Sequence, residues 1–298
     1  MKRAGIPTEE FLYPGHTACP GCGAMLVARY ALKVLGKNTI MNIPPCCFAA
    51  VPGTFPDTSL GIPLLYNAFE TSAATASGVE AALKIKGKKE KINVVAFAGD
   101  GGTADIGIQA LSGAIERGHE IIYICYDNEA YMNTGIQTSS LTPMGAATTT
   151  NPVGKKGGWR VKSKKNMMDI VAAHDIPYAA TVNPSYPIDF IKKIEKAKNI
   201  KGPSYIHAYS VCPTGWRCQS ELGLEIGRLA TESGIFPLYE FENGKCTINY
   251  KKKTKDVLEY YKQQGRFRHL SEDFIKEVQE IVDKEWEKLL LKEECSHR

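Results

Sequence analysis

The segment from residue 92 to residue 126 constrains the fold of this chain more than any other. Residues 92–98 form a nearly continuous apolar run, which is typical of a strand buried on both faces of a parallel sheet. A Gly-Asp-Gly-Gly turn follows at 99–102, then apolar residues at helical spacing, then a second apolar run at 120–126. A strand, a helix and a strand in this order favour parallel pairing. The segment therefore predicts an α/β fold, with a mostly parallel sheet and helices on both faces.

The remainder of the chain continues this alternation, and we expect a single domain. Length alone allows about two domains at ~150 residues each, but α/β chains of 298 residues are often one domain. We expect a Cys-rich loop at 8–23, a long connection at 127–165 and a C-terminal helical extension from about 255 to 298. Further strands are expected at 39–43, 178–182 and 204–209, and helices at 24–35, 71–86, 167–174, 187–197, 221–231 and from 271 onward.

Composition and charge argue against several classes of protein. The chain is 43% hydrophobic and 23% charged, which is ordinary for a globular protein. Its net charge of +5 comes without a basic stripe interleaved with aromatic residues, so no nucleic acid is expected as a partner. No apolar run approaches the ~20 residues that cross a bilayer. The N-terminus lacks the apolar core of a signal peptide. We therefore expect a cytoplasmic protein with no membrane partner.

Two polar residues are placed to bind a metal ion beside a phosphate group. Asp100 lies in the turn after the first buried strand, where free backbone N–H groups at a helix start can face a diphosphate. A carboxylate would repel the diphosphate, so a divalent ion should lie between them, and Mg²⁺ prefers oxygen ligands. Asn128 follows the next strand and reaches the same edge of a parallel sheet, with the Ala130 carbonyl as a third candidate ligand. The alternative is an ordinary tight turn followed by a loop, without a cofactor.

These residues carry a resemblance to a known family. Gly99-Asp100-Gly101 with Asn128 resembles the thiamine diphosphate motif, which begins with Gly-Asp-Gly and closes with Asn. The run at 127–137, Asp-Asn-Glu-Ala-Tyr-Met-Asn-Thr-Gly-Ile-Gln, is similar to the β subunits of 2-oxoacid:ferredoxin oxidoreductases. Glu129 departs from the general motif, which often ends in two Asn, but it agrees with the narrower family.

The resemblance implies a thiamine-diphosphate-binding domain of the diphosphate-binding type over residues 1–298. Asp100, Asn128 and the Ala130 carbonyl would bind Mg²⁺, and the glycines of the turn would approach the diphosphate. Asn133 would face the thiazolium ring and the substrate. The residues implied to bind the cofactor are Gly99, Asp100, Gly101, Gly102, Asn128, Ala130, Tyr131 and Asn133.

The cysteines indicate a metal or redox site. Without an export signal, nine cysteines argue against a disulfide framework. The Cys-Pro-Gly-Cys run at 19–22 by itself fits zinc, a redox pair or an iron–sulfur site. The resemblance implies one [4Fe–4S] cluster, held by Cys19, Cys22, Cys47 and Cys212. Cys47 is preferred to Cys46 because its spacing from the first cysteine matches the family, and Cys218 is the alternative to Cys212. A structural zinc site is the other interpretation of these thiols.

By the same resemblance the chain is one subunit of an enzyme that oxidatively decarboxylates a 2-oxoacid. Thiamine diphosphate acts as the electron sink, electrons leave through the cluster to ferredoxin, and CoA accepts the acyl group. We assign no general base to this chain, because the activating Glu is expected on an α subunit that supplies the pyrimidine-binding domain. The further partners implied are a γ subunit and a ferredoxin-like δ subunit.

Two runs favour pyruvate or a branched-chain 2-oxoacid over 2-oxoglutarate, and pyruvate is the first choice of substrate. Residues 133–137 and 264–270 look more like the pyruvate and branched-chain 2-oxoacid enzymes than the 2-oxoglutarate enzymes. A branched-chain enzyme acting on 2-oxoisovalerate is the alternative, and a zinc-stabilised scaffold without catalysis is the alternative of another class. The basic run at 155–165 is expected to be a solvated loop, with docking of ferredoxin as a second hypothesis. His207, on a strand, is expected to be a packed histidine.

Overall fold

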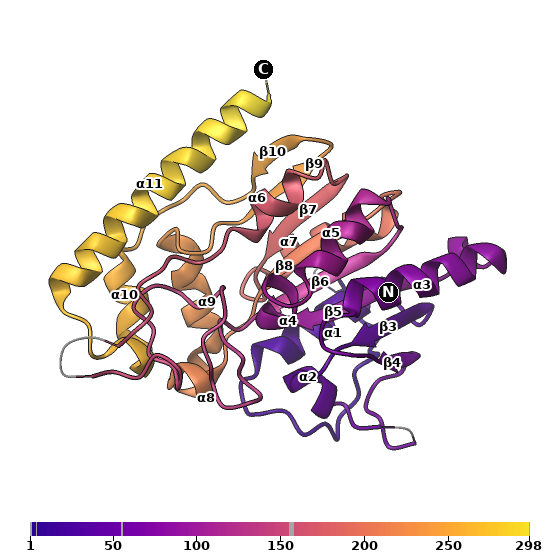
Figure 1. Cartoon of the computed structure of the whole chain (residues 1–298), viewed down its shortest axis with the longest axis horizontal. Coiled ribbons are helices and arrows are strands. Elements are labelled where there is room, and N and C mark those ends of the chain that lie inside the picture. Colours follow the sequence, from indigo (N-terminus) through magenta and orange to yellow (C-terminus); the bar gives the residue numbers. More distant parts are fainter. Residues whose placement is uncertain (1, 4, 55, 155–157, 298) are drawn as a thin grey trace.

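An eight-stranded sheet lies at the centre of the molecule (Figure 1). The computed structural model describes residues 2–3, 5–54, 56–154 and 158–297. The strands of this sheet are β3 (Thr39–Ile43), β4 (Leu64–Tyr66), β5 (Asn93–Gly99), β6 (Ile122–Asp127), β7 (Tyr178–Val182), β8 (Ser204–Tyr209), β9 (Tyr239–Glu242) and β10 (Lys245–Ile248). Their order is β10-β9-β7-β8-β6-β5-β3-β4. The strands from β7 to β4 are parallel, whereas β9 and β10 extend the sheet in antiparallel pairing.

Helices cover both faces of this sheet, which confirms the predicted fold class. The helices are α1 (Gly23–Leu35), α2 (Cys47–Ala50), α3 (Ser72–Ile85), α4 (Asp100–Ala104), α5 (Ile108–Glu116), α6 (Met167–Ala172), α7 (Pro187–Asn199), α8 (Pro213–Trp216), α9 (Gly223–Glu232), α10 (Val257–Lys262) and α11 (Glu272–Ser296). The core places α1 and α7 on one face and α3, α5 and α6 on the other. A separate two-stranded sheet pairs β1 (Lys2–Arg3) with β2 (Ile6–Pro7).

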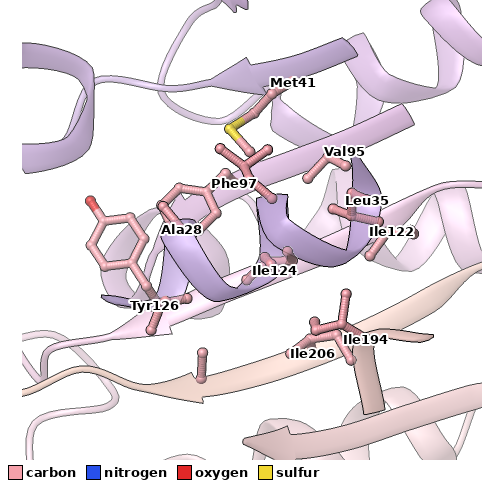
Figure 2. Close-up of a cluster of buried hydrophobic side chains, with 14 of the residues drawn as sticks. Ala28, Leu35, Met41, Val95, Phe97, Ile122, Ile124, Tyr126, Ile194 and Ile206 are labelled. Carbon is pink, nitrogen blue, oxygen red and sulfur yellow. The ribbon is translucent and has the colours of Figure 1, made fainter. Parts of the chain in front are cut away.

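The core between α1, α7 and the sheet shows why these sequences form layers (Figure 2). Phe97 of β5 stacks on Tyr126 of β6, with ring centroids 5.0 Å apart. Ala28 of α1 and Ile194 of α7 meet these strands at helical spacing and are fully buried. Successive residues of β5 face opposite sides of the sheet, so Val94 packs in the core beneath α3. The apolar run at 92–98 is therefore buried on both faces, as predicted.

The helix expected after the Gly-Asp-Gly turn is divided into α4 and α5. The helix is interrupted at residues 105–107. Here Gly107 lies so close to Gly102 that a Cβ atom on Gly107 would be 2.1 Å from the Gly102 carbonyl oxygen. Ile106, which we expected on the apolar stripe, is 51% exposed. The prediction of one continuous helix is wrong here, because the close approach of two glycines turns the chain.

The antiparallel strands β9 and β10 and the short helices α2 and α8 have no counterpart in the sequence prediction. Each has four residues, which is too short for a period of 2.0 or 3.6 residues to be recognised. The strands predicted at 39–43, 178–182 and 204–209 agree with β3, β7 and β8 at both ends.

The last turns of the C-terminal helix α11 lie beside β10 (Figure 1). Its first turn is fixed by Ser271, whose hydroxyl accepts a hydrogen bond from the Phe274 N–H at 3.2 Å. Of its apolar stripe, Val278 and Leu289 are buried, whereas Leu290 is 39% exposed. In the described part of the chain, no helix has the length and apolar composition to cross a membrane. The single-domain assignment and the cytoplasmic location stay predictions.

Candidate functional site

Strands β3, β5, β6 and β8 are parallel neighbours, so their carboxyl ends lie at one edge of the sheet. A cavity of about 350 Å³ is found at this edge. Its lining includes all the residues expected to bind the cofactor, together with two cysteines: Gly99, Asp100, Gly101, Gly102, Asn128, Ala130, Tyr131, Asn133, Cys46 and Cys47. The fold thus brings the predicted cofactor residues together, at the edge where ligands bind in open α/β sheets.

Asp100, Asn128 and Ala130 direct polar groups to one point at the wall of this cavity. The orientation that satisfies the hydrogen bonds of the Asn128 amide within the chain has its nitrogen donating to Asp100 Oδ1 at 2.9 Å and to the Ala130 carbonyl at 3.0 Å. The reversed orientation directs the amide oxygen to the same position, so that three oxygen atoms converge there, as a cation would require. Adjacent ligands of an octahedral Mg²⁺, with bonds of ~2.0–2.1 Å, stand about 2.9 Å apart. The three residues therefore fit a Mg²⁺ ion.

Asp100 is buried at the base of this group, with 1% of its surface exposed. Its carboxylate accepts a hydrogen bond from the Ser139 hydroxyl. Burial and the nearby Asp127 carboxylate raise the pKa of Asp100 well above its usual range. A buried carboxylate of this kind is compensated when a divalent cation binds beside it. The charge of the site, like its geometry, favours a cation.

A glycine and an aromatic ring shape the wall opposite these oxygens. A Cβ atom on Gly101 would lie 2.2 Å from the ring of Tyr131, so only glycine fits beneath that ring. The Tyr131 hydroxyl donates to Asp105 at 2.7 Å, which holds the ring over the turn. The lack of a side chain at Gly101 therefore makes room for the Tyr131 ring of the same chain. The sequence predicts that this glycine makes room for the diphosphate.

A buried ion network holds the residues on either side of Asn128. The Lys164 ammonium donates to Asp127 at 2.6 Å and to Glu129 at 2.8 Å. His207 Nε2 lies 3.0 Å from the Asp127 carboxylate. Burial alone would raise the pKa of Asp127, but Lys164 and His207 outweigh it and hold the pKa at about 2. Glu129, which stands where the general motif often has a second Asn, pairs with Lys164 and does not line the cavity.

Two residues from the C-terminal part of the chain hold the same segment. The Arg266 guanidinium donates to the Glu129 carboxylate and lies 4.0 Å from the ring centroid of Trp216. Trp216 Nε1 donates to the Asn128 carbonyl at 2.8 Å. The side chains of Arg266, Glu129 and Trp216 are almost fully buried. The loop that carries Asn128 is therefore fixed by charges and a hydrogen bond from distant parts of the sequence.

Sequence reasoning missed the roles of Lys164, Arg266 and Trp216. Lys164 belongs to the basic run expected to be solvated, and for Lys164 this expectation is wrong because its ammonium pairs with two buried carboxylates. Residues 155–157 of that run lie outside the described residues, so docking of ferredoxin on it stays a prediction. Arg266 lies in the run at 264–270. The resemblance of this run to the family is the only sequence feature that could have pointed to a role for Arg266. His207 is buried, as expected, and also contacts Asp127.

Lys164→Met is expected to destabilise the fold by about 1.5–3 kcal/mol, because Asp127 and Glu129 lose their shared cation and keep only His207 and Arg266 as partners. The free energy of unfolding in urea measures this loss. Lys165→Met is the matched control, since Lys165 is a neighbouring and more exposed lysine that lies 3.7 Å from the Asp105 carboxylate and donates to the Ala104 carbonyl, and it should cost less than about 1 kcal/mol. Equal small losses in both variants would show that the network does not stabilise this segment.

The four cysteines expected to hold a cluster come from three loops, each at the start of a helix. Cys22 is the N-cap of α1, Cys47 is the first residue of α2 and Cys212 is the N-cap of α8. The Cys212 sulfur accepts a hydrogen bond from the Gly215 N–H at 3.4 Å. Backbone N–H groups at a helix start favour a thiolate, and at Cys22 and Cys212 they oppose the rise in pKa that burial causes.

The electrostatic interactions of these thiols show that they share one region. Burial, and then the thiols of Cys212, Cys46, Cys22 and Cys19, raise the pKa of Cys47 to about 12. Burial, and also Cys22 and Cys19, raise the pKa of Cys212 to about 11. Cys19, Cys22 and Cys212 all act on Cys47, so these cysteines from three loops lie within electrostatic range of its thiol. A positively charged metal centre would reverse the repulsion among their thiolates.

The two alternative cysteines have different surroundings. Burial raises the pKa of Cys46 and the Tyr126 hydroxyl opposes this rise, whereas the charge that acts on Cys218 is that of Arg266. Within the described ranges, no group of three or more His, Cys, Asp or Glu side chains lies close enough to hold a metal ion. A [4Fe–4S] cluster takes one thiolate at each iron, so its ligands are spread more widely than those of one ion. The cysteine assignment stays a prediction.

A second cavity, of about 470 Å³, lies beneath α11. It is larger than the first, and Lys164 and His207 form part of its wall. None of the predicted cofactor or cluster residues lines it. The chemistry of the predicted site is therefore found in the smaller cavity, at the carboxyl edge of the sheet.

Comparison with known proteins agrees with this site. A family model described as thiamine pyrophosphate enzyme, C-terminal TPP binding domain, matches residues 49–208. Ketoisovalerate oxidoreductase subunit VorB of Pyrococcus furiosus is 53% identical over 295 residues, which are 97% of this chain and 95% of that protein. Pyruvate synthase subunit PorB of Methanothermobacter thermautotrophicus is 56% identical over 279 residues, 93% of this chain and 96% of that protein.

The chain belongs to the thiamine pyrophosphate enzyme family and to the group of 2-oxoacid oxidoreductase subunits that these two relatives represent. The resemblance drawn from the motifs is thereby confirmed. A solved structure, 2-oxoglutarate:ferredoxin oxidoreductase from Magnetococcus marinus with 2-oxoglutarate, coenzyme A and succinyl-CoA bound, has the same fold. It is 17% identical, with a TM-score of 0.60 over 93% of this chain and 96% of that one.

Proposed function

We propose that this chain is the β subunit of a pyruvate:ferredoxin oxidoreductase, or pyruvate synthase. The enzyme would convert pyruvate and CoA reversibly to acetyl-CoA and CO₂ and pass the electrons through a [4Fe–4S] cluster to ferredoxin. One observation carries this proposal most strongly: a three-oxygen group that fits Mg²⁺ lies in a cavity whose wall also holds Cys47, one of four grouped thiols. The relationship to the PorB subunit supports it.

In this proposal Asp100, Asn128 and the Ala130 carbonyl hold Mg²⁺, which in turn binds the diphosphate. Bound thiamine diphosphate supplies the carbanion chemistry and the electron sink that a 2-oxoacid requires. Gly99, Gly101 and Gly102 line the cavity on the diphosphate side. Tyr131 and Asn133 line it too, with Asn133 assigned to the thiazolium and substrate side. These residues bind and orient the cofactor rather than transfer a proton.

The cluster would be held by Cys19, Cys22, Cys47 and Cys212. Cys47 lines the cofactor cavity, so an electron leaving the cofactor has a short path to the cluster. A zinc-stabilised scaffold would use the same cysteines, but it gives no reason for the converging oxygens of Asp100 and its partners.

The proposal requires partner subunits. Among the described residues, no Glu lines the cofactor cavity, although activation of the cofactor's aminopyrimidine ring requires a carboxylate. We assign that carboxylate to an α subunit carrying the pyrimidine-binding domain. Additional γ and ferredoxin-like δ subunits would continue the electron path to ferredoxin.

A branched-chain enzyme acting on 2-oxoisovalerate is the second candidate. The VorB subunit is 53% identical and matches 97% of this chain, a larger share than PorB. Since the two substrates differ in the size of one apolar group, a pocket that discriminates between them is expected to do so by about tenfold or more in kcat/KM.

Two measurements on the protein test these proposals. Purified without oxygen, the chain should be brown, with broad visible absorbance that dithionite bleaches; a colourless protein with stoichiometric zinc would refute the cluster. The complex reconstituted with its partner subunits is then assayed with CoA, ferredoxin and a panel of 2-oxoacids. We expect pyruvate to have the highest kcat/KM, and a higher value for 2-oxoisovalerate would establish the second candidate.

A further inference from the structure

The four-residue helix α8 connects two parts of the proposed site that are far apart in the sequence. Its N-cap is Cys212, which is assigned to the cluster, and its last residue is Trp216. The Trp216 N–H donates to the Cys212 carbonyl at 2.8 Å, and the Gly215 N–H donates to the Cys212 sulfur at 3.4 Å. At the other end, the indole N–H donates to the Asn128 carbonyl at 2.8 Å.

Close packing reinforces this connection. A Cβ atom on Gly215 would lie 2.2 Å from the sulfur of Met132 and 3.3 Å from the sulfur of Cys212. Met132 lines the cofactor cavity. Gly215 of α8 therefore packs between a residue of that cavity and the Cys212 thiol. A helix held this tightly at both ends transmits a displacement from one end to the other, because packed interiors deform little.

Trp216 itself has no freedom to move independently. Its ring is fully buried, the Arg266 guanidinium stacks on one side at 4.0 Å, and the ring of Tyr209 packs at 5.5 Å in an edge-on geometry. Arg266 is in turn paired with Glu129, the residue after Asn128. The indole and the guanidinium thus contact consecutive residues of the loop that carries the proposed Mg²⁺ ligands.

We infer that Trp216 is a positioning residue that couples the cofactor site to the cluster: it places the Asn128 loop relative to the helix that carries Cys212. This inference rests on the proposed function. Coupling between two sites is reciprocal. Binding of thiamine diphosphate with Mg²⁺ should therefore shift the reduction potential of the cluster, and Trp216 should be required for most of that shift. A tenfold coupling corresponds to about 59 mV for a one-electron couple.

The test compares Trp216→Phe with Trp286→Phe. The first keeps a ring for Arg266 to stack on but removes the only indole N–H that contacts Asn128 within the described residues. The second is a matched control, because Trp286 lies on α11 at the wall of the second cavity. For each variant, iron and sulfide content, the Kd of thiamine diphosphate with Mg²⁺, and the midpoint potential of the cluster with and without that cofactor are measured.

We expect Trp216→Phe to keep its cluster, to bind the cofactor about tenfold more weakly after loss of one buried hydrogen bond, and to lose more than half of the cofactor-dependent potential shift. Trp286→Phe should match the wild type. Unchanged affinity in Trp216→Phe, or a full potential shift despite weaker binding, would overturn the coupling. Failure of the proposed function is distinguishable, because the wild-type chain would then bind no cluster or no cofactor.

Arg266→Lys tests the same contact if Trp216→Phe does not fold, as judged by circular dichroism. It keeps a positive charge beside Glu129 but loses the planar stack on Trp216. Weaker cofactor binding with a reduced potential shift and full iron content would support the inference. Wild-type affinity and shift in this variant would refute it.

Discussion

Asp100→Asn is expected to abolish Mg²⁺-dependent binding of thiamine diphosphate while leaving the iron–sulfur cluster in place. The substitution removes the only carboxylate among the three converging oxygens of Asp100, Asn128 and Ala130, and Mg²⁺ is held in proteins chiefly by one or two carboxylates. We expect affinity to fall at least about a hundredfold, ~2.7 kcal/mol. Titration calorimetry with thiamine diphosphate, with and without Mg²⁺, measures this loss.

The fold should survive this change. Burial and Asp127 raise the pKa of Asp100 well above its usual range, so the carboxylate is unfavourable in the metal-free chain and a neutral amide of the same shape removes that cost. Asp105→Asn is the matched control, because Asp105 directly follows the same helix α4 but does not line the cavity. Its amide oxygen can still accept the Tyr131 hydroxyl. Retained affinity in Asp100→Asn, or an equal loss in Asp105→Asn, would refute the anchor.

Cys47→Ser should lose the [4Fe–4S] cluster completely, whereas Cys46→Ser should retain it. The two thiols are adjacent in sequence, but Cys19, Cys22 and Cys212 act electrostatically on Cys47, while burial and the Tyr126 hydroxyl act on the pKa of Cys46. A serine hydroxyl is a poor substitute for a thiolate at iron. Iron content, visible absorbance and the electron paramagnetic resonance signal of the reduced protein measure the outcome.

Cys212→Ser and Cys218→Ser form a second pair with the same logic. The first is expected to lose the cluster and the second to keep it, since the charge near Cys218 is Arg266 rather than another thiol. The opposite result in either pair would exchange the ligand within that pair. Full iron content in all four variants would show that another group of residues holds the cluster.

Much of the fold and of the candidate site could be predicted because the signals are local. The strands at 39–43, 178–182 and 204–209 are read from short apolar runs between turns, and the structure has them at the same residues. Asp100 and Asn128 follow two buried parallel strands, so topology alone places them at one edge. The division of α4 from α5 could not be predicted, because it depends on contact between Gly102 and Gly107.

The support of the site could not be predicted for a related reason. Glu129 and Arg266 are 137 positions apart, and Trp216 is 88 positions from Asn128. No periodicity or turn signal links residues at such separations. The sequence predicts a solvated Lys164, because this residue lies in a run of basic residues. In the structure its ammonium contacts two buried carboxylates, and nothing in the neighbouring sequence indicates this.

The layers of this protein and the type of its predicted cofactor follow from local sequence patterns. Apolar periodicity selects strands and helices, and the Gly-Asp-Gly turn with its later Asn predicts oxygen ligands at one sheet edge. The residues that hold this edge are evident only in the folded chain: Lys164 pairs with the buried Asp127 and Glu129, and one indole hydrogen bond holds the Asn128 carbonyl. The physical reason is that a buried charge is stable only beside its partner, and chain folding alone brings such partners together.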